Sequence, residues 1–499
     1  MNLGETNNYT DYLGKFFFIV SFVILGFMIF LFIQKPFLHI DEWFTRGLLN
    51  ISLLDLIHVT ACDVHPPLYY ITVWVPVNIL NVLRIPYDLI FVMKMMSALP
   101  YILLFIISFT KIRKDYGWLA GGLFAFMLLA MGDLFTVFSI ARMYPLGTLL
   151  LVCGFIAVGE ILKDSKSKYW IILTVCAVLG AYTHYFLIIS FAILYGFLFL
   201  SIYANNRSEL KVWFSSVIYA VLCYVPWAIV LFNQLLVVGG DTFPIDDITF
   251  ENVLEFFSSI FTASQAGIIQ IAVILVFFVL FVMVFREYKK DPAENEIILL
   301  GLLVFVGTIV IGLIASVVYR PIVMVRYLTP SIGVGLLALS IFISRYVSKP
   351  GFSKVAVPLL IVILLFGFVN LSGQIDDISK NHESLLKNQE FIDSINNNDS
   401  VVIVTNMIKY VHFHDVLDNA IVYQGYSVGE REPARDFARI YDDKNSTFFI
   451  PDDYDKYQNK TIYLTTPNSK AITDIRDNYT LEPVWKIDNS EFLKLKRSK

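Results

Sequence analysis

Residues 39–70 read HIDEWFTRGLLNISLLDLIHVTACDVHPPLYY and directly follow the first long apolar run of the chain. Asp41 and Glu42 lie at one end of this stretch, and Asp63 and His65 lie at the other. All four side chains can exchange protons or hold a cation, and such groups are costly beside a bilayer. We therefore expect the stretch to have a function beyond connecting two apolar segments.

The composition is that of a polytopic membrane protein with a polar part attached. Of the 499 residues, 57% are hydrophobic, 15% aromatic and only 16% charged, whereas about 25% are charged in typical soluble domains. The net charge of −4 offers no basic face, so we expect no nucleic-acid partner. The four cysteines show neither a disulfide framework nor a metal-binding spacing.

Eleven apolar runs are expected to span the bilayer, which takes about twenty residues each, although two of them are short. They are residues 16–33, 89–109, 118–131, 145–162, 169–182, 186–203, 212–232, 266–285, 297–318, 328–343 and 355–371. A further run, residues 68–83, is broken by Pro76 and Asn78. It could be a short span or a helix lying in the membrane interface.

The charges of the loops decide between these two possibilities. If residues 68–83 do not cross, every basic loop lies on the same side as Lys15, as the positive-inside rule requires. These loops are residues 111–114, 163–168, 207–211, 286–290 and 345–354. We therefore expect a multi-pass protein of the cell membrane with a cytoplasmic N-terminus. Residues 34–88 would form one long external loop that contains membrane-hugging helices.

The chain becomes polar and acidic after Leu371. We expect a transmembrane module at residues 1–372 and a soluble extracytoplasmic α/β domain at residues 373–499. Within that domain the pattern predicts strands at 400–405, 420–423, 461–466 and 481–487, and helices at 384–395 and 469–477.

The predicted topology gathers polar side chains at the outer face. They are Asp41, Glu42, Asp63, His65, Arg142, His184, Arg320 and Arg326. Each has a purely structural explanation, such as a helix cap for Asp41 or contact of an arginine with lipid headgroups. External arginines are nevertheless unusual, and cations that face a carboxylate cluster suit an anionic ligand such as a lipid phosphate.

Five short motifs follow one another along the chain up to Pro330. They are Asp41-Glu42, Asp63-Val-His65-Pro-Pro-Leu-Tyr-Tyr, Ala141-Arg142-Met-Tyr144, Tyr182-Thr-His184-Tyr185 and Arg326-Tyr327-Leu-x-Pro330. In this order they resemble the family-39 glycosyltransferases and their relatives, the protein O-mannosyltransferases and the lipid A aminoarabinose transferases.

The resemblance implies a GT-C fold and an integral-membrane glycosyltransferase that acts on the extracytoplasmic side. Its donor would be a polyprenyl-phosphate-linked monosaccharide, and its acceptor a protein, a lipid or a glycan. No cofactor and no bound metal are expected. The family's catalytic base corresponds to Asp41, with Glu42 beside it. The other expected substrate-binding residues are Asp63, His65, Lys94, Arg142, Tyr144, His184, Tyr185, Arg320, Arg326 and Tyr327.

Two positions depart from the family pattern. Ser139-Ile140 stands where the family commonly has Gln-Glu, and Lys94 stands where it has an arginine, so the charge is kept but the bidentate fork is lost. Three alternatives stay open: a transporter or flippase for lipid-linked sugars, a non-catalytic surface-binding relative, and a ligase of lipid-diphosphate oligosaccharides. A transporter would carry ionisable groups near the midplane and paired halves, and neither is visible in the sequence.

Overall fold

The computed structural model describes residues 7–34, 38, 40–238, 248–262, 266–347, 349, 353–404, 413, 417, 419–424, 457, 459–466, 479–487 and 490–497. The chain forms two compact units. The first comprises Met1–Gln34, Val64–Thr72 and Phe91–Asp377, and the second comprises Lys35–Asp63, Val73–Ile90 and Ile378–Lys499.

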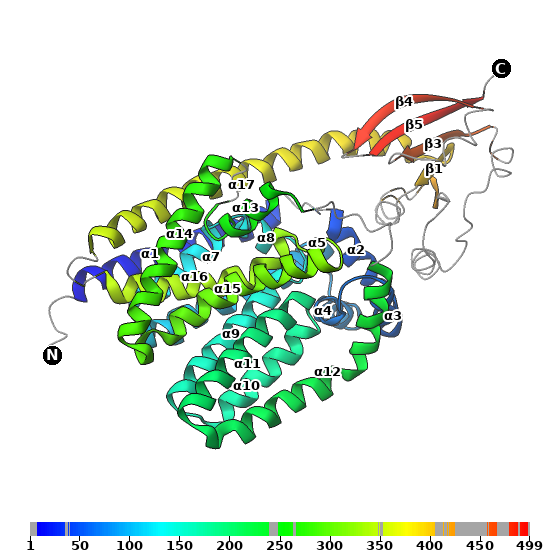
Figure 1. Ribbon diagram of the computed structural model, residues 1–499. Coiled ribbons are helices and arrows are strands. Elements are labelled where there is room, and N and C mark those ends of the chain that lie inside the picture. Colours follow the sequence, from blue (N-terminus) through cyan, green and yellow to red (C-terminus); the bar gives the residue numbers. More distant parts are fainter. Residues whose placement is uncertain are drawn as a thin grey trace. The chain divides into compact units, whose positions relative to one another are not determined.

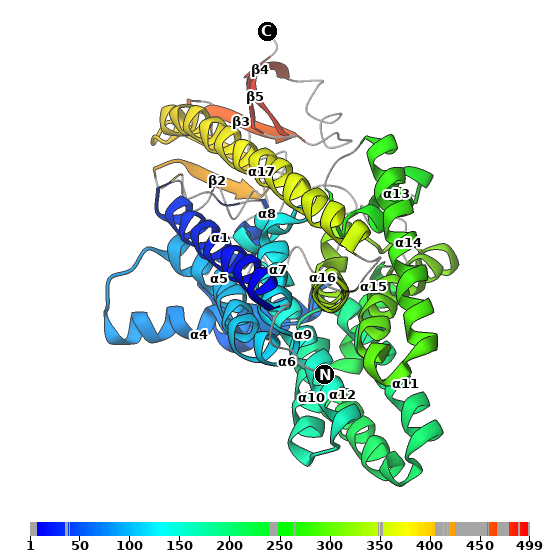
Figure 2. The same cartoon turned by 90° about the vertical axis from the view of Figure 1, so that its left-hand side faces the viewer.

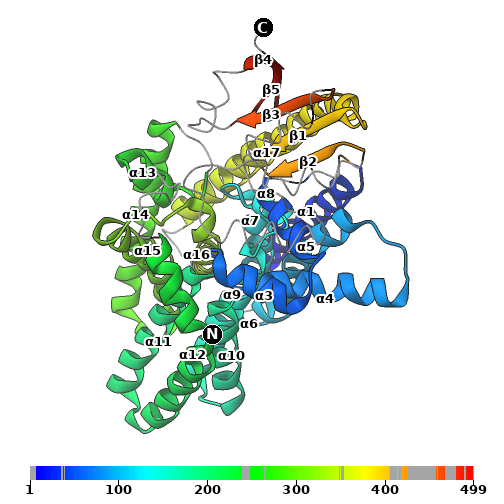
Figure 3. The ribbon, with the colours of Figure 1, turned by 90° about the vertical axis from the view of Figure 1, so that its right-hand side faces the viewer.

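The first unit is a helical bundle (Figure 1). Along the chain its elements are α1 (Asn7–Gln34), α5 (Leu89–Ile107), the π-helical turn η1 (Ser108–Ile112), α6 (Arg113–Tyr116), α7 (Trp118–Ala130), α8 (Leu134–Ser139), α9 (Tyr144–Lys163), α10 (Ser167–Ala181), α11 (Tyr185–Asn205), η2 (Arg207–Glu209), α12 (Leu210–Val238), α13 (Phe250–Ser258), α14 (Gly267–Lys290), α15 (Pro292–Val318), α16 (Val325–Tyr346) and the first part of α17 (Ser353–Ile395). Figures 2 and 3 show α10 beside α9 and α12, which it contacts.

Each of the eleven predicted spans forms a helix. In the part of the chain that the structure describes, nine helices are long and apolar enough to cross a membrane. The other two predicted spans form the shorter helices α7, of 13 residues, and α10, of 15 residues. Residues 119–130 of α7 are all buried, so this short helix lies among other helices of the bundle. The chain is a polytopic helical membrane protein with a small C-terminal sheet.

Glycines bring α1 and α7 into backbone contact. A Cβ atom at Gly122 would lie 2.1 Å from the carbonyl oxygen of Gly14, and one at Gly14 would lie 2.2 Å from the carbonyl carbon of Trp118. Small residues permit such close approach between helices in a membrane, where dispersion contacts replace the hydrophobic effect as the main attraction. No larger residue fits at either glycine without moving a backbone.

The second unit contains α2 (Ile40–Leu48), α3 (Leu53–Cys62), most of α4 (Leu68–Leu83) and a five-stranded sheet of order β2-β1-β3-β5-β4. Its strands are β1 (Ser400–Val404), β2 (Ile421–Gln424), β3 (Thr461–Thr466), β4 (Tyr479–Ile487) and β5 (Ser490–Arg497). β1 is parallel to β2 and β3, whereas β5 is antiparallel to β3 and β4.

The side chains of β1 alternate between two small cores, as the pleat of a strand requires. Val402 packs in a cluster with Phe492 and Ile392, and Val401 packs in the other with Leu464. The four predicted strands are confirmed, and β5 is an additional strand that the sequence analysis did not identify. The helix predicted at 469–477 lies outside the described residues.

α17 is one continuous helix of 43 residues. The sequence predicts a span at residues 355–371 and a separate helix at 384–395. The intervening residues are mostly polar but contain no proline, and Gly373 is their only glycine, so nothing in them forces the helix to end. The predicted domain boundary at 372/373 falls inside this helix and stays a prediction.

Candidate functional site

A cavity of about 120 Å³ lies in the first unit, where several helices begin or end. Its polar lining residues are His65, His184, Tyr185, Gln234 and Tyr327, and its other walls are the apolar residues Val64, Pro66, Phe186, Leu231, Leu235 and Ile322. These residues come from four separate segments of the chain. The motif residues His65, His184, Tyr185 and Tyr327 therefore meet in space.

The turn between α10 and α11 holds the start of α4 in place. The Leu68 backbone N–H donates to the Tyr182 carbonyl at 3.1 Å. Two prolines precede Leu68, and their fixed backbone angles limit how the chain can enter the helix. His65 is consequently held against the turn that carries His184.

His184 is at the centre of the site. It caps the N-terminus of α11, where its Nδ1 accepts from the Phe186 backbone N–H at 3.3 Å. Its ring centroid lies 4.8 Å from that of Tyr327, 5.8 Å from that of Tyr144 and 6.1 Å from that of His65. Because Nδ1 accepts, the proton of the neutral ring is on Nε2.

The electrostatic surroundings of His184 are cationic. Burial lowers the pKa of His184 well below its ordinary value, and His65, Arg142 and Arg326 lower it further. His184 is 5% exposed and is therefore neutral at pH 7. A positive potential at this point favours an anion in the neighbouring cavity.

Arg142 is buried beside His65. Its Nη2 lies 3.5 Å from His65 Nε2, and its guanidinium carbon lies 5.9 Å from the ring centroid of Tyr70. A guanidinium can only donate, so the contact with His65 needs an unprotonated Nε2. The 3.5 Å separation is long for a hydrogen bond. With a proton on His65 Nε2, an anion inserted between the two groups would accept a hydrogen bond from each.

The start of α16 supplies a second arginine. The guanidinium carbon of Arg326 lies 5.8 Å from the ring centroid of Tyr327, and the Tyr327 ring lies 6.3 Å from that of Tyr144 at the start of α9. Arg326 is one of the cations that lower the pKa of His184. The aromatic rings thus form one wall of the site, with both arginines nearby.

Tyr185 connects the site to α12. Its hydroxyl donates to Gln234 Oε1 and accepts from Trp227 Nε1 at 3.0 Å. Gln234 was not predicted, because the predicted span ends at residue 232 whereas α12 continues to Val238. Trp227 lies inside the predicted span but belongs to none of the five motifs. A buried amide on a long apolar helix was the available signal.

Two further residues that were predicted to bind substrate, Lys94 and Arg320, lie in the first unit. Lys94 is buried on α5, three residues before Ser97, whose hydroxyl is 3.0 Å from the Tyr69 hydroxyl on α4. Residues three apart share a helix face, so Lys94 lies on the face that meets α4. Arg320 is partly buried between α15 and α16, two residues before Ile322 of the cavity wall.

The three predicted acids belong to the second unit. α2 begins at Ile40, so Asp41 and Glu42 both lie in its first turn, and Asp41 is not the cap of a helix that starts at Glu42. Glu42 is fully buried and Asp41 partly exposed. Asp63 caps the C-terminus of α3, where its N–H donates to the Val59 carbonyl at 3.0 Å. Their roles in catalysis and binding stay predictions.

The described part of the chain shows no candidate metal site. Among those residues, no group of three or more His, Cys, Asp or Glu side chains is arranged to hold a metal ion. The histidines, arginines and tyrosines of the cavity are suited instead to bind an anion beside an apolar surface.

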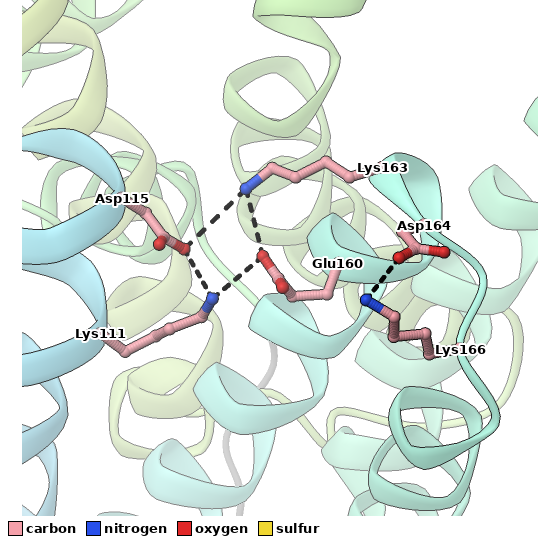
Figure 4. A network of polar contacts seen from close by, with 6 residues as sticks. All are labelled: Lys111, Asp115, Glu160, Lys163, Asp164 and Lys166. Atoms are coloured by element: carbon pink, nitrogen blue, oxygen red, sulfur yellow. Dashed lines mark hydrogen bonds and ion pairs between the residues drawn. The ribbon is translucent and has the colours of Figure 1, made fainter.

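A second polar region lies at the other end of α9 (Figure 4). Lys111 contacts Asp115 at 2.8 Å and Glu160 at 3.0 Å, and Lys163 contacts the same two acids at 3.9 and 3.1 Å. Lys111 and Lys163 belong to basic loops that we predict to be cytoplasmic, and Glu160 lies at the same end of α9. The 20 residues of α9 rise about 30 Å, which matches the hydrocarbon thickness of a bilayer.

Neither a protein-family model nor a curated protein matches the sequence. Among solved structures, the chain is similar to ArnT from Cupriavidus metallidurans in the apo state, with a TM-score of 0.58 and 10% identity over 96% of this chain and 97% of that chain. The structure of that protein bound to undecaprenyl phosphate gives a TM-score of 0.57 with the same identity and coverage. The chain therefore has the GT-C fold that its sequence motifs predict.

Proposed function

We propose that this protein is a membrane glycosyltransferase that moves a monosaccharide from a polyprenyl-phosphate-linked donor to an acceptor hydroxyl on the extracytoplasmic side. The observation that carries the proposal is the cluster of Arg142, His65, His184 and Arg326 beside the cavity. The ArnT structure with bound undecaprenyl phosphate supports a lipid phosphate as the anion.

Arg142 and Arg326 bind the donor phosphate in this proposal. Both guanidinium groups can donate two parallel hydrogen bonds to phosphate oxygens. A buried site strengthens these bonds and needs little reorganisation as charge develops on the leaving group. Lys94 adds a third cation, and the apolar cavity wall suits the part of the lipid next to the phosphate.

Asp41 is the general base. It takes the proton of the acceptor hydroxyl as the hydroxyl oxygen bonds to the anomeric carbon and the bond from that carbon to the phosphate oxygen breaks. The phosphate departs with its electron pair and needs little acid assistance. A single displacement of this kind inverts the anomeric carbon through an oxocarbenium-like state. Glu42 and Asp63 hold the sugar hydroxyls or orient the base.

The site faces the outside of the cell, with the N-terminus in the cytoplasm and the C-terminal domain outside. The Lys111 and Lys163 network supports this orientation, because these loops are basic and lie at the far end of α9 from Arg142. Labelling of single cysteines by a membrane-impermeant reagent in intact cells tests it. The cysteine of Lys166→Cys should be protected from the reagent, and its labelling in intact cells would contradict the proposed orientation.

Transfer is tested with purified protein and a panel of undecaprenyl-phosphate monosaccharides, by mass-spectrometric detection of released undecaprenyl phosphate. Asp41→Asn should lower kcat by about 10²- to 10⁴-fold, the usual contribution of a general base. Asp164→Asn is the matched control, because Asp164 is 61% exposed and pairs with Lys166 at the opposite end of α9. Near-normal transfer by a folded Asp41→Asn protein would exclude Asp41 as the base.

A further inference from the structure

Two amides of α17 contact the segment that precedes Arg142: Asn370 at the last residue of α7, and Gln374 in the loop and short helix that follow. Asn370 Nδ2 donates to the Phe261 carbonyl at 2.8 Å and to the Ala130 carbonyl at 3.2 Å. One turn later, Gln374 Nε2 donates to the Gly132 carbonyl at 3.2 Å and Gln374 Oε1 accepts from the Thr136 N–H at 2.8 Å. Both amides are buried, so they fix the loop where water does not compete for its backbone.

The helix in this loop depends on Gln374. α8 has only six residues, too few to be stable alone, and its N-cap residue Asp133 makes no side-chain capping hydrogen bond. An N-cap side chain ordinarily accepts from the amide three residues later, which here is Thr136. Gln374 replaces that cap from a distant helix. It also holds Gly132, whose φ of +54° favours glycine and where a Cβ atom would lie 2.4 Å from the Ser259 carbonyl oxygen.

Hydrogen bonds continue from Thr136 to Arg142. The Thr136 carbonyl accepts from the Ile140 N–H at 3.1 Å and from the Ser139 hydroxyl at 2.7 Å. The Ile140 carbonyl in turn accepts from the Arg142 N–H at 2.8 Å. The position of the Arg142 backbone is therefore set by the segment that Gln374 caps.

We propose that Gln374 is a positioning residue for Arg142, and that Asn370 anchors the same loop from the preceding turn. The inference rests on the proposed function, in which Arg142 contacts the donor phosphate. Gln374 does not touch the donor; it holds α8 and so holds the arginine in the geometry that binds the phosphate. Small displacements of such a group cost a large factor in binding and rate.

The test compares two nearly isosteric amide replacements, Gln374→Met and Asn295→Leu. Asn295 is the matched control because its buried amide also bonds two backbone carbonyls, of Glu287 and Asp291, and one further group, the Tyr346 hydroxyl. It lies at the start of α15, next to Asp291 in the basic loop. Gln374→Met should weaken binding of undecaprenyl phosphate by about 10- to 100-fold, whereas Asn295→Leu should change it by less than about twofold.

A combined Gln374→Met, Arg142→Ala protein should bind no more weakly than Arg142→Ala alone, because the two residues act as one unit. Gln374→Glu keeps an oxygen for the Thr136 N–H and should retain more affinity than Gln374→Met. Unchanged binding by Gln374→Met, equal losses for Asn295→Leu, or additive losses with Arg142→Ala would overturn the inference.

Hydrogen exchange separates this inference from the proposed function. Amides of residues 132–142 should exchange faster in Gln374→Met than in the parent protein, with or without ligand. If the parent protein does not bind undecaprenyl phosphate, the proposed function fails while exchange still tests the anchoring. If the parent binds but exchange and affinity are unchanged in Gln374→Met, the positioning role fails alone.

Discussion

The two ends of α9 carry charge in different ways. At the end near Lys163, each lysine drawn in Figure 4 contacts a carboxylate at 2.6 to 3.9 Å. At the other end, His184 is held neutral by burial, with His65 and the guanidinium groups of Arg142 and Arg326 lowering its pKa further. The first arrangement balances charge within the protein and stabilises the helix ends. The second creates a positive potential that a bound anion would offset, and for this reason we propose it as the functional end.

The largest difference between the two ends of α9 is expected when Arg142 is removed. Arg142→Ala should lower kcat/KM for the donor by about 100-fold or more, because truncating one member of a buried charged contact costs about 2–5 kcal/mol. Steady-state kinetics with varied donor concentration measure the loss. The kcat/KM of Arg142→Lys should lie between those of the parent protein and Arg142→Ala. A change confined to the KM of the acceptor would contradict the phosphate role of this end.

His184 should make the stability of the protein depend on pH. Its pKa is lowered in the folded state, so below its ordinary value of 6.5 the unfolded state binds a proton that the folded state does not. Stability should therefore fall as pH drops below about 6.5, by at most about 1.4 kcal/mol per pH unit. Melting temperatures at pH 5 to 8 test this, with His184→Asn as the variant that loses the dependence. An equal fall in the variant would assign the effect to other groups.

Changes at the paired end should have small effects. Glu160→Gln should cost no more than about 1 kcal/mol, because its partner lysines are one-third to one-half exposed and such pairs are screened by solvent. Donor kinetics should be unchanged within about twofold. A loss of activity similar to that of Arg142→Ala, without unfolding, would show that the two ends are not functionally distinct.

The smallest effect is expected in the apolar part of the bundle, where Ser190 and Thr308 hydroxyls lie 2.9 Å apart between α11 and α15. A double-mutant cycle with alanine should give a coupling of about 0.6 kcal/mol, the average for such bonds in membrane helices. Melting temperatures of the four proteins provide the measurement. If this coupling free energy exceeds the one measured between Glu160 and Lys163, the hydroxyl pair contributes more to the stability of the bundle than that ion pair does.

The helices were predictable from sequence because apolar length is a strong signal in a membrane protein. β5 was not predicted, because residues 490–497 (SEFLKLKR) include three basic residues at the end of the chain and therefore resemble a polar tail. The continuity of α17 was missed for a related reason. A change from apolar to polar composition marks a change of surroundings, but it does not end a helix.

The sequence motifs predicted which residues of the cavity meet, although not how they are held. His65, Arg142, His184 and Tyr327 belong to recognisable motifs, and the structure brings them together. Gln234, Asn370 and Gln374 belong to none. Their roles depend on contacts between distant segments, such as Gln374 with Thr136, which local sequence patterns do not encode.

The contact between Gly14 and Gly122 also bears on how the protein is made. α1 is synthesised before α7, yet the backbone that packs against its Gly14 belongs to α7, far downstream. The first helix can enter the membrane early, but its final packing must wait until α7 has left the ribosome. A chain interrupted between these helices would leave the face of α1 around Gly14 without its packing partner in the bilayer, a surface that membrane quality control can recognise.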